Sequence, residues 1–233
     1  MDNPSVNKLL NALPQASKDR ILPQLKLVSL PLGKVIYESG QNVANVYFPT
    51  DSIISLLYVM EDGASAEISV VGNEGLVGIA VFMGGESTPN RAIVQSAGSA
   101  YTLPASVLKK EFNTEPDIRL LLLRYTQALM AQMAQTAVCN RHHSIDQQLC
   151  RWLLLSLDRL PTNNLTMTQE LIANMLGVRR EGVTEAAGKL QKLNVITYKR
   201  GHITVTNRKE LEKLSCECYA VVKSETDRLG LFA

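Results

Sequence analysis

The sequence has no long apolar run. No stretch approaches the ~18 consecutive apolar residues that a membrane-spanning helix needs. The first ten residues, MDNPSVNKLL, also lack the basic and then apolar pattern of a secretory signal. We therefore expect a cytoplasmic protein without a membrane partner.

Cysteines and catalytic motifs are scarce. The P-loop, His-Glu-x-x-His and Gly-x-Ser-x-Gly patterns are all absent, so we predict no enzyme activity. The spacing of the four cysteines is irregular and does not indicate a disulfide framework. These cysteines are Cys139, Cys150, Cys216 and Cys218. A hydrophobic content of 45% is typical of globular proteins, and 233 residues allow one large domain or two modest ones.

The net charge is only +2, but it is unevenly distributed. Residues 1–116 contain 8 Lys and Arg against 11 Asp and Glu, a net charge of −3. The remaining 117 residues contain 16 against 11, a net charge of +5. Within 168–208 the count is 7 basic residues against 3 acidic ones. This basic excess indicates a polyanionic partner for the C-terminal half.

Short β-rich runs occupy residues 25–103, after one or two short helices in the first 24 residues. Turn sequences such as EDGAS and SAGS separate the runs. This spacing favours an antiparallel sandwich or barrel, such as a jelly-roll-like β-roll. The runs are LKLVSL, GKVIY, NVYFP, SIISLLYVM, AEISVVG, RAIVQSAG and SAYTLP.

Residues 116–141 form one long predicted helix, with Pro116 near its start. Two apolar seams run along it at helical spacing, so we expect it to pack against both its own barrel and another helix. A dimer partner is the favoured second helix, and a helix fully buried within one chain is the alternative. The predicted dimer seam contains Leu123, Met130, Met133 and Ala137. The other seam contains Ile118, Leu122, Tyr125 and Leu129.

A helix-turn-helix pattern follows a helix over 144–160 and a polar linker, PTNNLT. The segment Thr166–Gln169 offers an N-cap, with Gln169 placed for a capping box, and Gly177 suits the end of that helix. After a turn of three residues, REGVTEAAGKLQKL has apolar residues at helical spacing. The small residues 186–188 would let another helix approach closely. This pattern predicts a helix-turn-helix.

The start of the second helix carries Arg179, Arg180 and Glu181, although helix N-termini favour acids. Arginines at this position are favourable if the helix tip enters the DNA major groove. There arginine hydrogen-bonds to guanine, and glutamate accepts a hydrogen bond from the cytosine amino group. The alternative is a solvated surface. The next segment, VITYKRGHITVTN, predicts a hairpin wing that meets phosphates, and 208–229 predicts a final helix. The wing turn carries Lys199, Arg200 and His202.

This order of elements resembles the Crp/Fnr family of bacterial transcription regulators. The resemblance is strongest in PDIRLLLLRYTQALMAQMAQTAVCNRHHSIDQQLCRWLL and TQELIANMLGVRREGVTEAAGKLQKLNVI. It implies an α+β fold with a β-roll sensor domain over 1–115, a dimerisation helix over 116–143 and a winged helix-turn-helix domain over 144–233. It also implies a homodimer that binds a near-palindromic operator in double-stranded DNA, with RNA polymerase as a further partner.

The family's reader helix often carries Arg-Glu at its tip and another arginine four residues on. Arg180 and Glu181 match this pattern, but Glu185 stands at the third position, so we expect a different target sequence. The predicted DNA-binding residues are Thr168, Gln169, Arg179, Arg180, Glu181, Thr184, Lys199, Arg200 and His202.

The resemblance also places a candidate effector pocket in the β-roll. The family's cyclic-nucleotide binders hold the ribose with an acid after a glycine, but here Gly78 is followed by Ile79. The phosphate-binding segment keeps Arg91-Ala92, although Arg91 could equally be a solvated strand residue. Met133 stands where these binders carry a polar contact to the base. We expect no cyclic AMP binding, and a different small-molecule effector stays open.

The cysteines and histidines of this chain do not suit the known cofactors of the family. An iron–sulfur cluster needs about four thiolates, and no cysteine precedes Cys139. A haem in the sensor domain would usually need an axial histidine, and the three histidines are His142, His143 and His202. We therefore predict no cofactor and no metal site.

Two minor alternatives concern metals. His142 and His143, beside Cys139 and Asp146, could form part of a metal site, although a hydrated bend is favoured. The pair Cys216 and Cys218 could be redox-active or bind metal at a dimer surface, although two partly buried thiols on the last helix are favoured.

The alternative to a transcription regulator is a signalling or scaffold protein whose β-roll controls a protein partner. The basic winged segment argues against that alternative. The effector, the operator sequence and the direction of regulation do not follow from the sequence.

Overall fold

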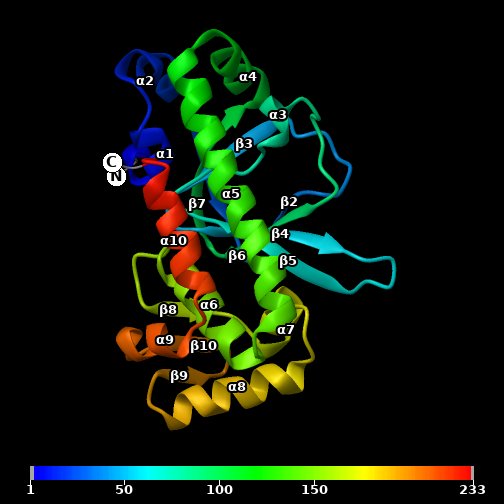
Figure 1. Ribbon diagram of the computed structural model, residues 1–233. Coiled ribbons are helices and arrows are strands. Elements are labelled where there is room, and N and C mark those ends of the chain that lie inside the picture. The colour runs from blue at the N-terminus through cyan, green and yellow to red at the C-terminus, as the bar shows by residue number, and fades with distance from the viewer. Residues whose placement is uncertain (1–2, 232–233) are drawn as a thin grey trace.

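The computed structural model describes residues 3–231 and places a β-roll and a smaller winged domain along one long helix (Figure 1). This helix, α5, spans Pro116–His142. Helices combined with antiparallel sheets confirm the predicted α+β fold. Within residues 3–231, no helix is both long enough and apolar enough to cross a membrane.

The β-roll contains two antiparallel sheets, and every predicted β-rich run contributes a strand. The three-stranded sheet has the order β1 (Lys26–Leu30), β7 (Gly98–Pro104), β3 (Asn45–Pro49). The four-stranded sheet has the order β2 (Val35–Tyr37), β6 (Arg91–Ser96), β4 (Ile53–Val59), β5 (Ser65–Val71). Four short elements precede the strands: η1 (Pro4–Val6), α1 (Lys8–Asn11), α2 (Gln15–Ile21) and η2 (Leu22–Gln24).

The β-roll also contains two helices that the sequence did not predict, α3 (Ala80–Met83) and α4 (Ala105–Thr114). α3 is a single turn, which is too short to show helical periodicity. α4 buries Leu108, and its Phe112 ring stacks on Phe82 of α3 with 5.0 Å between the ring centroids. These two helices therefore stabilise each other across the chain.

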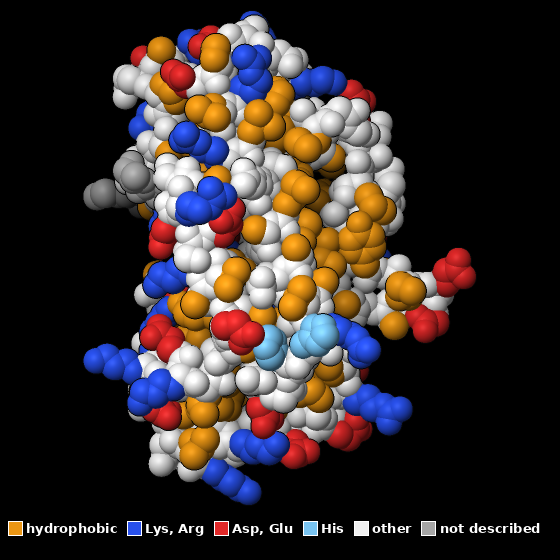
Figure 2. All heavy atoms as spheres, viewed as in Figure 1, with side chains coloured by type: hydrophobic (Ala, Val, Ile, Leu, Met, Phe, Trp, Pro, Cys, Tyr) orange, Lys and Arg blue, Asp and Glu red, His pale blue; other side chains and the backbone are white. Residues whose placement is uncertain are grey.

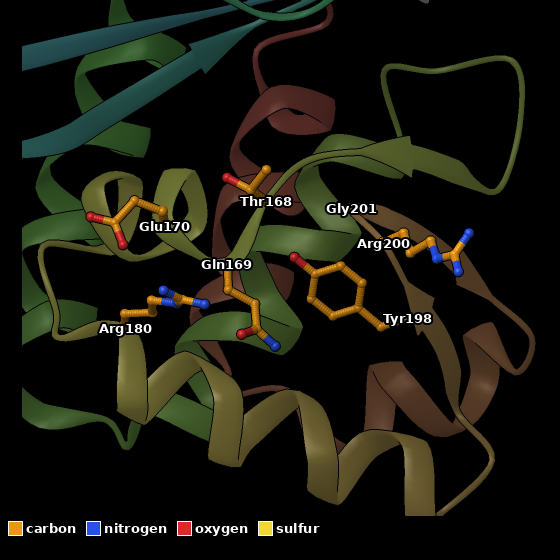
Figure 3. A pocket seen from close by; sticks show the side chains of 7 residues that line it. All are labelled: Thr168, Gln169, Glu170, Arg180, Tyr198, Arg200 and Gly201. Atoms are coloured by element: carbon orange, nitrogen blue, oxygen red, sulfur yellow. The ribbon is translucent and has the colours of Figure 1, made fainter.

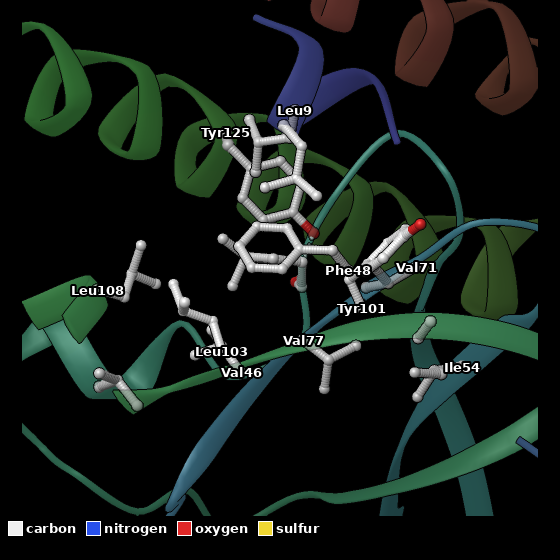
Figure 4. Close-up of a cluster of buried hydrophobic side chains, with 14 of the residues drawn as sticks. Leu9, Val46, Phe48, Ile54, Val71, Val77, Tyr101, Leu103, Leu108 and Tyr125 are labelled. Atoms are coloured by element: carbon white, nitrogen blue, oxygen red, sulfur yellow. Dashed lines mark hydrogen bonds between the residues drawn. The ribbon is translucent and has the colours of Figure 1, made fainter. Parts of the chain in front are cut away.

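One side of α5 closes the core of the β-roll (Figure 4). The Tyr125 hydroxyl donates a hydrogen bond to the Leu76 carbonyl at 2.9 Å. Gly75 makes room for this ring, since a Cβ there would lie 2.3 Å from the Tyr125 oxygen. The seam of Ile118, Leu122, Tyr125 and Leu129 is at most 4% exposed, as predicted.

The other side of α5 is exposed within this chain. Leu123 is 44% exposed and Met130 is 59% exposed, whereas Met133 is half-buried against the β-roll. Exposed residues recur at alternating steps of three and four along this side and are apolar at every position except Gln127, and orange side chains follow α5 in Figure 2. The apolar residues of this row are Leu120, Leu123, Met130, Ala134 and Ala137. Burial of α5 within its own chain is therefore the wrong alternative.

The winged domain is built around a second hydrophobic cluster that contains Trp152 and Leu153 and also takes in Ile53, Leu57 and Val70 of the β-roll. Its helices are α6 (Ile145–Leu157), α7 (Gln169–Leu176), α8 (Arg180–Lys192), α9 (Arg208–Leu214) and α10 (Cys218–Arg228). Its sheet has the order β8 (Asn164–Thr166), β10 (His202–Val205), β9 (Ile196–Lys199). The β9–β10 hairpin confirms the predicted wing.

Two expectations for this domain are wrong. The segment 161–166 is not only a linker, because Leu165 is buried and pairs with Ile203, which makes 164–166 strand β8. The last predicted helix is interrupted, because α9 ends before Ser215, which has an extended backbone, and α10 begins at Cys218. The break lets α9 bury Leu211 in the winged-domain core while α10 packs against α5.

A buried polar network joins the β-roll to α6. Glu67 on β5 is 7% exposed and accepts hydrogen bonds from Ser55 at 2.5 Å and from the Trp152 indole at 3.1 Å. Burial raises the pKa of Glu67 to about 7, although these donors and the positive charges of Arg151 and Arg159 oppose that shift. Glu67 therefore releases its proton at a much higher pH in the folded chain than in the unfolded chain.

This pKa shift predicts a pH dependence of folding stability. The folded pKa lies above the unfolded value of 4.5, so the folded chain binds the extra proton and its stability falls as pH rises from 4.5 to 7. Between pH 5 and 8, Glu67 should lower the free energy of unfolding of the wild type by about 2–3 kcal/mol, and Glu67→Gln should abolish that decrease. Urea unfolding at pH 5 and pH 8 measures the free energy of unfolding, with the exposed Glu61→Gln as a control for the loss of a charge. Parallel profiles for wild type and Glu67→Gln would contradict this assignment.

Candidate nucleic-acid interface

Local capping sets the geometry of α7. Thr168 is its N-cap, and the Thr168 hydroxyl accepts a hydrogen bond from the Leu171 amide at 3.2 Å. The predicted capping box is wrong, because Gln169 instead accepts from the Thr184 hydroxyl of α8 at 2.8 Å. Gly177 ends α7 with φ +65°, a left-handed conformation that glycine adopts without strain. The chain then turns directly into α8.

The inner face of α8 is apolar and tightly packed. Val183, Ala186, Ala187 and Leu190 are at most 3% exposed, as their spacing predicts. Of the small residues expected to allow a close helix approach, Ala186 and Ala187 are buried, but Gly188 faces open space; a Cβ at Gly182 would lie 2.7 Å from Ile145 of α6, so the chain also comes close there. Packing on this face leaves the opposite face and the N-terminal tip of α8 free for a partner.

The tip of α8 is strongly positive. Arg179 is the N-cap without a side-chain capping bond, Arg180 is the first helical residue, and both side chains are exposed. The helix macrodipole adds positive potential at the same end, and Glu181 is the one acid in the first turn. This potential suits an anionic partner. Glu185 lies one helical turn beyond this tip and forms an ion pair with Lys189 at 3.0 Å.

The wing turn places a second arginine at the surface. Arg200 and Gly201 have φ values of +51° and +82° between the paired residues Lys199 and His202, the pattern of a two-residue type I′ hairpin. The His202 ring contacts the Thr166 hydroxyl at 3.3 Å, which ties β10 to β8. The tight turn holds Arg200 exposed at the end of the hairpin.

An open groove of about 510 Å³ lies between the tip of α8, the start of α7 and the wing (Figure 3). Four predicted residues line it: Thr168, Gln169, Arg180 and Arg200. The sequence analysis missed Glu170 and Tyr198, which it treated as a first-turn helix residue and an ordinary strand residue. Tyr198 is anchored by its hydroxyl, which donates to the Met167 carbonyl at 2.8 Å.

The other predicted DNA-binding residues do not line this groove. Arg179, Glu181, Thr184, Lys199 and His202 are nevertheless exposed on the surrounding surface. Thr184 also donates to the Arg180 carbonyl at 3.0 Å. The groove and its rim therefore present a polar, mostly basic surface built from three separate elements.

The candidate effector pocket is only partly assembled. Gly78, Ile79 and Met133 line a cavity of about 50 Å³, much smaller than the roughly 300 Å³ or more of typical ligand sites. Arg91 does not line this cavity and forms an ion pair with Glu38 at 2.7 Å. Ala92 is fully buried in the β-roll core.

Two family models match the chain. The model for a cyclic nucleotide-binding domain matches residues 27–115, and the model for a Crp-like helix-turn-helix domain matches residues 147–214. Together the two matches cover most of the chain, including both sheets of the β-roll and the whole groove. They disfavour the alternative of a scaffold protein without DNA binding.

Relatives and solved structures agree with these matches. The Global nitrogen regulator of Synechococcus elongatus is 21% identical over 193 residues, which cover 78% of this chain and 86% of that protein. The Anaerobic regulatory protein of Aggregatibacter actinomycetemcomitans is 22% identical, with coverage of 78% and 73%.

Among solved structures, one from Eubacterium rectale assigned to the Crp/Fnr family superposes with a TM-score of 0.70 at 19% identity, covering 90% of this chain and 98% of that chain. FixK2 from Bradyrhizobium japonicum superposes with a TM-score of 0.68 at 17% identity, covering 82% and 98%. At these identities the similarity to solved structures concerns the fold alone. The assignment to a family depends on the two domain matches. The chain therefore belongs to the Crp/Fnr family of DNA-binding transcription regulators.

Proposed function

We propose that the protein binds a near-palindromic DNA operator as a homodimer, with α8 of each subunit in the major groove. The observation that carries this proposal is the exposed Arg180 at the positive tip of α8, facing the same groove as Arg200 of the wing. A two-fold dimer with one reader helix per subunit requires half-sites about one helical turn, ~34 Å, apart.

The positions of the side chains suggest separate roles in this complex. Arg180 lies at the helix tip and donates to a guanine, while Glu181 beside it accepts from a cytosine amino group. Arg179, Lys199 and Arg200 surround that tip and meet phosphates, which position the domain without reading sequence. The remaining predicted contacts, Thr168, Gln169, Thr184 and His202, flank the groove with hydrogen-bonding groups.

The exposed seam of α5 supports the homodimer. Isolated apolar residues on a surface are ordinary, but a row at steps of three and four on one helix, interrupted here at Gln127, is the pattern of a coiled-coil interface. A second copy of α5 would cover Leu123, Met130 and Ala137 across a two-fold axis. The same axis would present the two α8 helices to one face of DNA.

RNA polymerase stays a prediction from the family resemblance, and a small-molecule effector stays open. A cytoplasmic location and the absence of catalysis stay predictions from the sequence patterns. The small cavity beside Gly78 and Ile79 supports the expectation that cyclic AMP does not bind. The domain limits 1–115, 116–143 and 144–233 are likewise proposed, with the junction at the bend between α5 and α6.

The first prediction separates base reading from phosphate contact. On an operator selected from genomic fragments, Arg180→Ala should weaken binding by about 1–3 kcal/mol per half-site and have little effect on scrambled DNA. Arg200→Asn should weaken both alike and lower the salt dependence by about one unit per lost phosphate contact. Asparagine tolerates the left-handed backbone at this position, so the wing turn is preserved.

Titrations across a salt series on both DNAs measure these effects. Lys110→Ala is the matched control, because it removes one exposed positive charge on α4, at the opposite end of the molecule from α8 (Figure 1). If Arg180→Ala weakens operator and scrambled DNA equally, Arg180 is an electrostatic anchor and does not read a base.

The second prediction concerns assembly. Light scattering should show a dimer, and Met130→Glu should dissociate it, because the substitution buries an unpaired charge in the seam. Met60→Glu is the matched control, since Met60 is 66% exposed at the β4–β5 turn, away from α5. A monomeric wild type, or equal effects of the two substitutions, would rule out this interface.

A further inference from the structure

The fold brings together four potential metal ligands from two distant segments. Cys139 lies on the last turn of α5, and His143 caps that helix. Cys216 and Cys218 lie at the break between α9 and α10. The three sulfur atoms and one ring nitrogen all lie within 4.8 Å of one another. The sequence analysis placed these residues in two separate groups, and the fold joins them without His142 or Asp146.

The separations match a single tetrahedral ion. Zinc bonds of about 2.3 Å to sulfur and 2.0–2.1 Å to nitrogen place two sulfurs about 3.8 Å apart, and a sulfur and a nitrogen about 3.6 Å apart. The Cys139 and Cys216 sulfurs are 3.6 Å apart, and the Cys218 sulfur is 3.4 Å from Nδ1 of His143. Small adjustments of side chains would therefore complete the site.

The surrounding groups orient these ligands. Nε2 of His143 lies 3.3 Å from the Glu217 carboxylate, so Nε2–H can donate to it and leave Nδ1 free to bind a metal. Metal-bound histidines usually have such a partner. The Gln135 amide donates to the Cys218 sulfur at 3.0 Å. This hydrogen bond stabilises a thiolate in a buried setting.

The charge balance also suits a metal thiolate centre. Three thiolates and one divalent ion carry a net charge of −1. Arg151 is 3% exposed and its Nε has no hydrogen-bond partner within the described residues, so its buried positive charge is available to offset this negative charge.

We propose that Cys139, His143, Cys216 and Cys218 bind one zinc ion. Four protein ligands of the Cys₃His type make a closed, structural site. An iron–sulfur cluster fits less well, because its protein ligands bind two or more irons and must be spread further apart than the ligands of a single ion. A Cys139–Cys216 disulfide would leave the convergence of His143 and Cys218 unexplained.

The location of the site gives the ion a structural role. It links the C-terminal end of α5 to the break before α10, and His143 directly precedes Ser144, the N-cap of α6. Zinc therefore restrains the bend between the β-roll side of the molecule and the winged domain. Binding takes the ligands as thiolates and releases their protons to solvent, so it weakens as pH falls.

The test uses the full chain without an affinity tag, purified reduced and without oxygen. Elemental analysis should find about one zinc per chain. Cobalt exchanged into the protein should give thiolate charge-transfer bands and the visible bands of a tetrahedral ion. Zinc removal by a chelator should lower the melting temperature, and zinc addition should restore it.

Variants locate the ion. Cys216→Ser should lose zinc, and His143→Gln, at a partly exposed bend where misfolding is a smaller concern, should weaken zinc binding by more than about 10-fold. Glu217→Gln should weaken it by about 10-fold through the orientation of His143. Cys150→Ala and His142→Gln are matched controls that should keep wild-type affinity.

Several results would overturn the proposal. They are the absence of zinc and cobalt binding in the reduced protein, full binding by Cys216→Ser or His143→Gln, and loss of binding in both controls. Iron with acid-labile sulfide would identify a cluster in place of a single ion. A Cys139–Cys216 disulfide in a protein that binds no metal when reduced would identify a redox pair.

Discussion

The architecture depends on the burial of one face of α5 against the β-roll. Tyr125, Leu122 and Leu129 complete a core that the two sheets cannot close by themselves, and Gly75 gives the Tyr125 ring its place. Anchoring along this face fixes the rotation of the helix about its axis. The opposite apolar row therefore points outward, and α10 packs alongside. Both the proposed dimer and the proposed zinc site follow from that single orientation.

The junction with the winged domain combines apolar and polar contacts, since Ile53, Leu57 and Val70 of the β-roll belong to the same hydrophobic cluster as Trp152. Glu67 meets Trp152 and Ser55, and Glu74 pairs with Arg159 at 2.7 Å. Such contacts have strict geometry, and leaving a buried partner unpaired costs about 1–3 kcal/mol. They therefore specify one arrangement of the β-roll on α6, while the hydrophobic cluster shared by both parts stabilises the junction.

The candidate DNA-binding groove and its rim concentrate positive charge at a local cost. Two arginines at the start of α8 oppose the macrodipole, and Arg200 occupies a left-handed backbone position. Neither feature increases the folding stability of the domain without DNA. Both concentrate positive charge around one groove, where DNA phosphates would neutralise it, so these features favour binding at a cost in local stability.

The order and type of the main elements follow from local patterns in the sequence. Alternating runs marked the strands, two apolar seams marked α5, and Gly177 with the apolar face of α8 marked the helix-turn-helix, because each signal repeats over several neighbouring residues. Short elements gave no such signal: α3 has one turn, and β8 depends on the single buried residue Leu165.

Which distant residues meet depends on how the elements pack. The structure shows that Gln169 bonds to Thr184, that Arg91 pairs with Glu38 away from the cavity, and that Tyr198 lines the groove. It also brought Cys139 within 3.6 Å of Cys216, 77 residues later in the chain. Spacing in sequence sets the face of a helix or strand that a residue occupies. Contacts between elements depend on how those faces pack, and packing is a property of the whole fold.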